Sequence, residues 1–408
     1  MALDVKRAFL HGKARRHIYI KLPKEDPRYD GGKTIGRLLK SMYGTRDAPQ
    51  IWAGEVKRIM ESMGFRACRI NPCIFYHEDM DLQVITHVDD FLCCGEGANL
   101  RWLRDELMKT YEITGDILGN GKDETTKLTY LKRTIGWTPD GLTYEASETY
   151  VPRLLEEWSM TTCSPVSTPG VKVRVEQEKP EPLSNDMASK YKRAAATLNY
   201  LSLDRPDISF SSKELSRKMT DPDEGDIVAL KRLLRYLQGC KRLIWHFPWQ
   251  EDTNKLDVLA DSDWAGCTRT RRNTSGGILQ RGRHLLHHWS KTQATVALSS
   301  GEAELNAALK GAAEGLFLQG ITSEMQEKDK LTIFGDSTAS RGILLREGSA
   351  PLKHLHVKQL WVQEHVARKA MDVVKIPRAE NPADALTHHW SAEAAGHYAS
   401  MGLRRVAT

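Results

Sequence analysis

The chain has 408 residues, which exceeds one ordinary domain and predicts two or three. With 40% hydrophobic and 27% charged residues it can bury apolar cores, and no apolar run approaches the roughly 20 residues of a membrane helix. The net charge of +6 is compatible with a polyanionic partner, and the mixed charges of the first residues exclude a signal peptide. Seven scattered cysteines without a CxxC pair argue against a disulfide framework or a zinc site, and favour a reducing compartment.

The first part of the chain predicts short strands, hairpins and two helices. A strand that begins this close to residue 1 indicates that a segment upstream is missing. The expected elements are, in chain order, a strand, short helix and strand over 1–20, a helix over 38–64, a hairpin over 82–94, a helix over about 97–110 and a hairpin around 138–141.

The second part begins with a linker rich in Pro, Ser, Thr and charge over 161–190, and helical patterns cover 187–240. From about residue 245 the pattern changes to three strands, a long helix from Ser300 to about Gln326, a strand, two helices, a strand and a final Ala-rich helix. This order predicts a mixed sheet with helices packed on it.

Four carboxylates stand at the ends of elements in this last region. Asp261 and Asp336 each close a predicted strand, Glu302 lies at the start of the long helix, and Asp384 would open the final helix. Adjacent strand ends of a sheet place such groups side by side. Because a cluster of acids is costly without a cation, an all-oxygen site for Mg²⁺ or Mn²⁺ is expected. Two such ions about 4 Å apart would activate a water and stabilise the leaving 3′-oxygen of a phosphodiester.

Two of these positions have alternatives in the sequence. Glu302 is preferred to Glu304, which is rotated by about 200°, because its helical stripe continues through apolar residues. Asp263 shares strand parity with Asp261, and Asp261 is chosen because it ends the alternating run. Structural roles compete as well: Ser299 with Glu302 fits a capping box, and the two later aspartates could each be helix N-caps.

The same region resembles the ribonuclease H domain of copia-type LTR retrotransposon polyproteins over about 255–390. The resemblance rests on ADSDWAGCTRTRRNTSGGILQ, HHWSKTQATVALSSGEAEL, IFGDSTAS, KHLHVKQLWVQEHV and NPADALT. It implies that Asp261, Glu302, Asp336 and Asp384 match the four metal-binding carboxylates of that family, and that the domain cuts the RNA strand of an RNA–DNA hybrid.

The first half resembles the reverse transcriptase of the same polyproteins. LDVKRAFLHG resembles the first palm motif, in which Asp4 matches the metal-binding aspartate, and HVDDFL matches the paired aspartates, Asp89 and Asp90. KSMYGTRDAPQIW resembles the segment that supports template and incoming nucleotide, with Gly44 and Pro49 at its turn. Asp4 on one strand and the Asp pair at a hairpin tip could hold two Mg²⁺ for attack by a primer 3′-OH.

The motifs and elements together predict a mixed α+β and α/β protein. TYLKRTIGWTPDGLTY resembles the primer-grip hairpin, and SPVSTPG, RPDIS and LKRLLRYLQG resemble the thumb and connection. The predicted domains are a palm and primer grip without fingers over 1–160, a linker with a helical thumb and connection over 161–244, a ribonuclease H-like mixed sheet with flanking helices over 245–395, and a tail over 396–408.

Three departures from the family argue against polymerase activity in this chain. A fingers subdomain is absent upstream of the first palm motif, and Lys6 and Arg7 are no substitute for its basic residues. His87 stands where the family has a tyrosine, and the run over 108–128 is looser than the usual palm segment. Each departure affects how the substrates are positioned in the polymerase site, where a misplacement of about 1 Å lowers the rate of the reaction by about 10²-fold.

Basic residues gather near the carboxylate motifs. From Arg269 to Lys291 there are six Lys or Arg, three His and no acid, and a second basic run covers 353–369. Arg269, Arg271 and Arg272 are the candidates for phosphate contacts, although a solubilising loop would have the same composition. Selectivity for RNA would come from 2′-hydroxyl contacts in the minor groove of the hybrid.

The expected function is therefore RNA-directed DNA synthesis, weakened in this chain, together with two-metal hydrolysis of RNA in RNA–DNA hybrids. The expected partners are an RNA–DNA hybrid, an RNA template and a DNA primer, with no membrane. The expected location is intracellular, in cytoplasmic virus-like particles or the nucleus. The alternative is an inactive retrotransposon remnant that at most binds nucleic acid.

Overall fold

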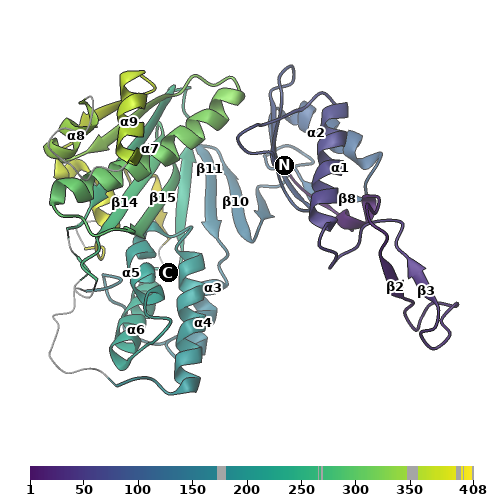
Figure 1. Ribbon diagram of the computed structural model, residues 1–408, viewed down its shortest axis with the longest axis horizontal. Helices are drawn as coiled ribbons and strands as arrows, with labels where there is room; N and C mark the ends of the chain where they lie inside the picture. The colour runs from purple at the N-terminus through teal and green to yellow at the C-terminus, as the bar shows by residue number, and fades with distance from the viewer. Residues whose placement is uncertain are drawn as a thin grey trace. The chain divides into compact units, whose positions relative to one another are not determined.

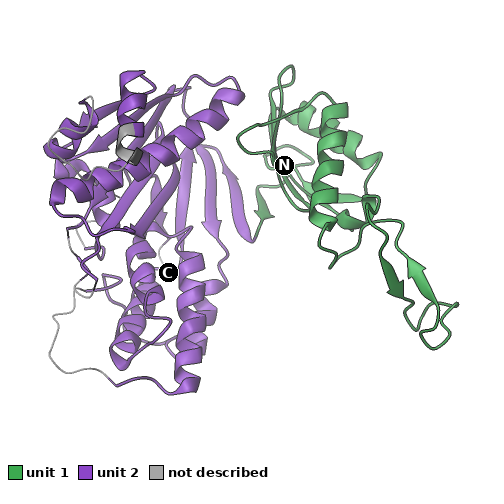
Figure 2. Ribbon diagram, in the orientation of Figure 1, with its two compact units in different colours: residues 1–131 green, residues 132–408 purple. Residues whose placement is uncertain are grey.

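The computed structural model describes residues 1–171, 181–264, 266–267, 270–346, 357–391, 397 and 399–406, without the side chains of 357–360. It divides into two compact units, residues 1–131 and 132–408 (Figure 2). The fold mixes helices with antiparallel and parallel strands, which confirms the predicted fold class. Within the described part of the chain, no helix is both long and apolar enough to cross a membrane.

Unit 1 is built on an antiparallel sheet with the strand order β4-β5-β6-β7-β1-β8. Its elements are β1 (Ala2–Val5), η1 (Ala8–His11), β2 (Tyr19–Lys21), β3 (Ile35–Arg37), α1 (Ala48–Ser62), β4 (Arg66–Ala67), β5 (Ile74–His77), β6 (Leu82–His87), β7 (Asp90–Cys94), α2 (Gly97–Met108), β8 (Ile113–Asp116) and β9 (Lys127–Tyr130). β2 and β3 pair with each other as a separate hairpin (Figure 1).

The core of unit 1 lies between one face of this sheet and the helices α1 and α2. Alternate residues of β1, β6 and β7 are buried, as are Trp52, Val56 and Met60 of α1 and Leu103 and Leu107 of α2. Burial recurs at every second residue of the strands and at every third or fourth residue of the helices. This is the pattern expected where an apolar face of a sheet packs on apolar faces of helices. The opposite face of the strands carries the acidic side chains discussed below.

Unit 2 begins with a second antiparallel sheet and a group of helices. β10 (Arg133–Thr138), β11 (Gly141–Ala146), β12 (Leu243–Pro248) and β18 (Leu403–Arg405) lie in the order β18-β12-β11-β10. The helices are α3 (Tyr150–Glu157), α4 (Asn185–Leu201), α5 (Pro206–Ser216) and α6 (Glu224–Gly239), which share one apolar core. A capping box, in which Asp223 and Asp226 each accept the other's backbone N–H, fixes the start of α6.

The remaining part of unit 2 is a five-stranded mixed sheet with the order β15-β14-β13-β16-β17. It is formed by β13 (Lys255–Ser262), β14 (Thr274–Arg281), β15 (His284–Thr292), α7 (Ser300–Glu324), β16 (Lys330–Gly335), α8 (Thr338–Leu344), α9 (Val357–Ala367), β17 (Met371–Lys375), η2 (Arg378–Glu380) and η3 (Pro382–Leu386). The first three strands are antiparallel, whereas β16 and β17 run parallel to β13.

The long helix α7 packs closely on this sheet through small residues. A Cβ atom at Gly311 would lie 2.8 Å from Val258 Cγ1, and one at Gly315 would lie 2.6 Å from Leu331 Cδ1. The close approach brings the first turns of α7 next to the ends of β13 and β16. It therefore decides which helical residues can reach the acids there.

Helix α5 joins the helical group to the mixed sheet. The buried His288 of β15 contacts Ser209 (3.4 Å) and the carbonyl oxygen of Leu203 (3.1 Å), and Ser211 bonds to His389 (2.8 Å). Since these contacts lie inside unit 2, the helical region and the mixed sheet form one compact body. The predicted boundaries at 160 and 244 stay a prediction, and both fall within this body.

Three elements differ in detail from the sequence prediction. Of the expected final Ala-rich helix, Pro382–Leu386 form the 3-10 helix η3, which Asn381 caps by accepting the N–H of Ala383 (3.2 Å), and residues 392–396 lie outside the described residues. The predicted tail supplies a strand, since β18 pairs with β12 through Trp245 and Leu403. The helix predicted over 38–64 begins later, at Ala48, with Pro49 in its first turn.

Candidate active sites

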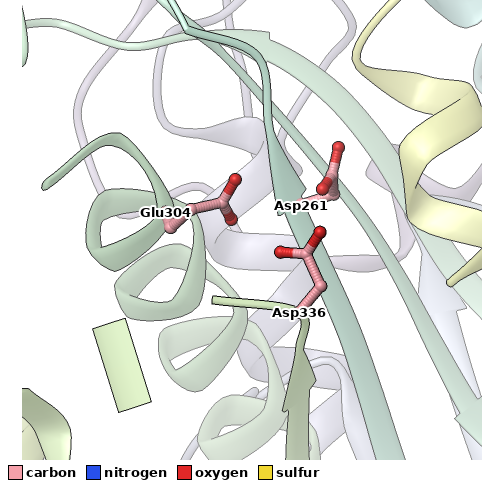
Figure 3. A group of neighbouring side chains, drawn as sticks. All are labelled: Asp261, Glu304 and Asp336. Carbon is pink, nitrogen blue, oxygen red and sulfur yellow. The ribbon is translucent and has the colours of Figure 1, made fainter. Parts of the chain in front are cut away.

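Three carboxylates meet beside the mixed sheet. Asp261 lies on β13, Asp336 follows β16 and Glu304 belongs to α7 (Figure 3). One carboxylate oxygen of each lies within 4.8 Å of those of the other two. The parallel register pairs Leu259 with Phe334, so the two strands end together and present their aspartates side by side.

Burial and repulsion between the charges perturb the pKa values of Asp261 and Glu304. Asp261 is 4% exposed, and burial first, then the charges of Asp384 and Asp336, raise its pKa to about 7. Burial, followed by the charges of Asp261 and Asp336, raises the pKa of Glu304 to about 9. Thr387 donates its hydroxyl to Asp261 Oδ2 (2.9 Å), which partly offsets the shift. Acids arranged in this way favour a cation.

The structure corrects the choice of the helical acid, because Glu304 and not Glu302 reaches the strand ends. Glu302 turns back from the first turn of α7, where its Oε2 accepts the N–H of Leu298 (2.8 Å) and its own N–H is accepted by Ser299 Oγ (3.2 Å). This is the capping role that the sequence offered as the alternative. Glu304 continues instead in the helical row of Gly311, the row that packs on the sheet.

Asp384 lies near the three-carboxylate group. Among the described residues, the group itself consists of Asp261, Glu304 and Asp336 and does not include Asp384. It sits in η3, and its charge is the second cause of the raised pKa of Asp261. Arg378 donates to Asp384 Oδ1 from Nε (3.1 Å) and from Nη2 (2.9 Å). His388 Nε2 is 3.6 Å from Asp384 Oδ2.

The remaining alternatives also have clear positions. Asp263 Oδ1 accepts the backbone N–H of Thr274, outside the three-carboxylate group. The N-cap of α8 is Ser337, which accepts the N–H of Ser340 (3.1 Å), so the neighbouring Asp336 does not cap that helix. The carboxylates of Asp261 and Asp336, the residues chosen from the sequence, thus lie together, and their role as metal ligands stays a prediction.

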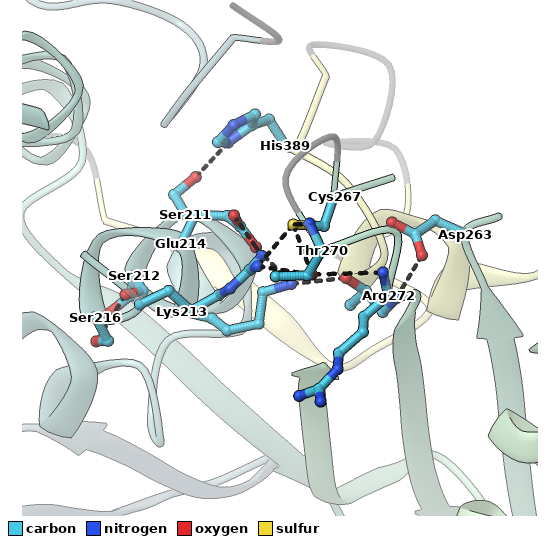
Figure 4. A network of polar contacts seen from close by, with 12 residues as sticks. Ser211, Ser212, Lys213, Glu214, Ser216, Asp263, Cys267, Thr270, Arg272 and His389 are labelled. Atoms are coloured by element: carbon cyan, nitrogen blue, oxygen red, sulfur yellow. Dashed lines mark hydrogen bonds and ion pairs between the residues drawn. The ribbon is translucent and has the colours of Figure 1, made fainter. Parts of the chain in front are cut away.

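Helix α5 contacts the segment between β13 and β14 (Figure 4). Lys213 Nζ donates to Thr274 Oγ1 (2.7 Å), and Arg217 Nη2 lies 2.7 Å from Cys267 Sγ. Burial would raise the pKa of the Cys267 thiol, but contacts from Thr270 and Arg217 outweigh it and lower the pKa to about 7. All seven cysteines are free thiols.

The three predicted phosphate-binding arginines lie in the same segment. Arg271 and Arg272 are exposed, and Arg271 has a φ of 55°, whereas Arg269 lies outside the described residues. Among the described residues, no hydrogen bond or ion pair is found for the guanidinium groups of Arg271 and Arg272. Their role in binding nucleic acid stays a prediction.

The palm acids come together at one end of the unit 1 sheet. Asp4 on β1 pairs directly with Asp90 on β7, and the N–H of Val5 donates to the carbonyl oxygen of Asp89 (2.9 Å). Burial, then the charges of Asp89 and Asp4, raise the pKa of Asp90. At the hairpin tip Val88 has a φ of 58°, and its carbonyl accepts the indole N–H of Trp52 (2.5 Å).

The other palm candidates have identifiable positions. Gly44 adopts a φ of 88°, a conformation that favours glycine, in the turn before α1, and Pro49 is exposed near the start of that helix. His87 is exposed and pairs with Asp90 across the hairpin. Lys6 (2.6 Å) and Arg7 (2.8 Å) both form ion pairs with Glu112.

Known proteins are similar to the first part of the chain or to nearly all of it. Residues 1–172 match the family model described as reverse transcriptase (RNA-dependent DNA polymerase). The Pol polyprotein of transposon TNT 1-94 from Nicotiana tabacum is 29% identical over 406 residues, which is 94% of this chain and 29% of that protein. The Pol polyprotein of transposon RE1 from Arabidopsis thaliana is 28% identical over 99% of this chain and 27% of that protein.

Two further similarities differ in coverage. An uncharacterized mitochondrial protein of Arabidopsis thaliana, AtMg00810, is 33% identical over 57% of this chain and 92% of its own length. A foamy viral protease-reverse transcriptase, solved with an RNA/DNA hybrid, superposes with a TM-score of 0.54 at 10% identity, over 92% of this chain and 44% of its own. The chain spans less than a third of the two transposon relatives. Residues 1–172 thus carry a reverse transcriptase domain, and Pol polyproteins of copia-type transposons are homologues of nearly the whole chain.

Proposed function

We propose that the mixed-sheet part of unit 2 is a metal-dependent nuclease that hydrolyses the RNA strand of RNA–DNA hybrids. The observation that carries the proposal is the meeting of Asp261, Glu304 and Asp336 within 4.8 Å. Three mutually repelling carboxylates, one of them almost completely buried, are costly to maintain for structure alone. A hybrid as substrate is supported by the family and by the solved foamy viral relative, which holds one.

The donor set fits a hard divalent cation, because it consists of carboxylate oxygens. Asp261, Glu304 and Asp336 would hold Mg²⁺ or Mn²⁺, and Asp384 is the neighbouring acid that could contribute to a second ion. Two ions would supply activation of a water and stabilisation of the leaving 3′-oxygen. The protein itself orients Asp261 through the Thr387 hydroxyl and fixes the reach of Glu304 through the close packing of α7.

Unit 1 supports a second function, RNA-directed DNA synthesis. The observation in its favour is the pairing of Asp4 with Asp90, with Asp89 next to it at the hairpin tip. These acids would hold Mg²⁺ beside the primer 3′-OH of an RNA template and DNA primer. Lys6 and Arg7 both pair with Glu112, and a triphosphate would have to displace this carboxylate to bind them. We therefore propose weak synthesis at most for this chain.

The decisive test is cleavage of a hybrid whose RNA strand carries a 5′ label. The full chain in Mg²⁺ or Mn²⁺ is expected to release short labelled RNA, and Asp336→Asn is expected to abolish release. Glu304→Gln should behave like Asp336→Asn, whereas the matched Glu302→Gln should cut like the unaltered chain. Salt-dependent binding of the hybrid without cleavage in either metal would instead establish the inactive, binding-only remnant.

A further inference from the structure

The chain places a cation of its own beside the carboxylate group. Arg378 stands in η2, directly before the turn that carries Asp384. Two of its donors, Nε at 3.1 Å and Nη2 at 2.9 Å, converge on one oxygen, Asp384 Oδ1. The guanidinium therefore occupies Asp384 Oδ1, an oxygen that a metal ion bound by Asp384 could use.

The influence of Arg378 extends beyond its partner. Its charge acts against the raised pKa of both Asp261 and Glu304, and Asp384, Asp261 and Asp336 in turn raise the pKa of Arg378. The guanidinium thus lies in the field of all the acids that would hold metal. A fixed positive charge in this position opposes the arrival of a further cation.

Exposure determines how easily this ion pair gives way. The Arg378 side chain is 75% exposed and that of Asp384 is 27% exposed. An exposed arginine can leave its partner at small cost, since such pairs stabilise by only about 0.2–1 kcal/mol, which corresponds to about 1.4- to 5-fold in binding. A divalent cation bound by several carboxylates can therefore displace the arginine from Asp384. The apparent affinity of the site for that cation is reduced by the same factor.

We propose that Arg378 is a tethered counter-ion that competes with the second metal ion for Asp384. The inference rests on the proposed two-metal function and deepens it by assigning a residue that sets metal affinity. With the arginine in place, the second ion binds with a lower apparent affinity than it would without the arginine. Without it, Asp384 Oδ1 no longer accepts hydrogen bonds from a guanidinium.

The test is a Mn²⁺ titration of the full chain without nucleic acid at pH 8, with free Mn²⁺ measured by electron paramagnetic resonance. All titrations use a reference chain in which Asp89→Asn and Asp90→Asn remove the palm site, and this chain is the unaltered chain to which the further variants are compared. It should bind two ions, and Asp384→Asn should lose the weaker one. Arg378→Gln should bind that weaker ion about two- to fivefold more tightly. Arg378→Lys, which keeps the charge, should stay within about twofold of the unaltered chain.

The control is Arg368→Gln, which removes an exposed arginine of the same unit that pairs with Glu364 (2.5 Å) and should leave both affinities unchanged. Unchanged or weaker binding of the second ion by Arg378→Gln would overturn the proposal, since an arginine that only anchors the η2–η3 turn would have this effect. Binding of fewer than two ions by the unaltered chain would overturn the two-metal function itself, which separates the two failures.

Discussion

Glu304 on α7 and Asp261 on β13 bring carboxylate oxygens to within 4.8 Å of each other, on elements that approach closely only because glycines line the helix. This relationship has a measurable consequence for stability. The pKa of Glu304 is about 9, well above its ordinary value of 4.5, so the folded chain binds more protons than the unfolded chain between these values. Metal-free stability therefore falls as pH rises through this window.

Glu304→Gln removes this penalty. In EDTA at pH 8 the variant should be more stable than the unaltered chain, by on the order of 1–3 kcal/mol, and the difference should vanish near pH 4. Excess Mg²⁺ should reverse the order, because the metal stabilises only the intact site. Thermal unfolding at the two pH values checks this, and equal stability in EDTA at pH 8 would contradict it.

A buried ion pair holds the helical group of unit 2 together. Arg205 and Asp207 are 2% and 1% exposed and pair at 2.6 Å, and Tyr236 donates its hydroxyl to Asp207 Oδ2 (2.8 Å). Asp207→Ala leaves the guanidinium buried without its partner, so urea denaturation should show a loss of about 3–5 kcal/mol. Arg193→Ala, which removes an exposed pair with Glu157, should change stability by less than about 1 kcal/mol.

The packing of α7 on β13 predicts a contrast between two helical glycines. Gly311→Val places a Cβ 2.8 Å from Val258 Cγ1 and should destabilise the chain by about 1–3 kcal/mol. Gly342→Ala in α8 meets no atom within 4 Å and should be neutral or stabilise by up to about 1 kcal/mol. Urea denaturation of both variants measures the change in the free energy of unfolding. Equal changes for the two variants would indicate that α7 is loosely packed on the sheet and would contradict the prediction.

The reactivity of Cys267 reports the contact between α5 and the segment after β13. Its pKa of about 7 predicts that alkylation by iodoacetamide reaches half its maximal rate near pH 7. Arg217→Met removes a contact that favours the thiolate and should shift this midpoint upward. Mass spectrometry of the Cys267 peptide at several pH values checks the shift, and a midpoint that does not move would show that Arg217 has no influence.

The strand ends were predictable from the sequence, and the helical acid was not. Asp261 and Asp336 close alternating apolar runs. Because side chains on a strand alternate between its two faces, the pattern of buried residues fixes the face on which each aspartate lies. Helix α7 is buried on more than one side, with Leu305 as well as Gly311 in the core, so no single apolar stripe marks its sheet-facing row. The small residues in line with Glu304 carried the missing signal, because close packing requires them.

Other features depend on contacts between distant parts of the chain. The pairing of Asp4 with Asp90 followed from two recognisable motifs. The three-residue strand β18 has no alternation of its own and exists through its pairing with β12. Nor did the sequence indicate that Arg378 would fold back on Asp384, since the turn between η2 and η3 creates that contact.

The central claim is that Glu304, with Asp261 and Asp336, forms the nuclease centre. The most direct test is the rate of RNA cleavage in an RNA–DNA hybrid by Glu304→Gln and Glu302→Gln, measured side by side in Mg²⁺. The account predicts loss of cleavage by at least about 10²-fold for Glu304→Gln and a rate close to that of the unaltered chain for Glu302→Gln. The reverse pattern, or equal rates for the two variants, would contradict it.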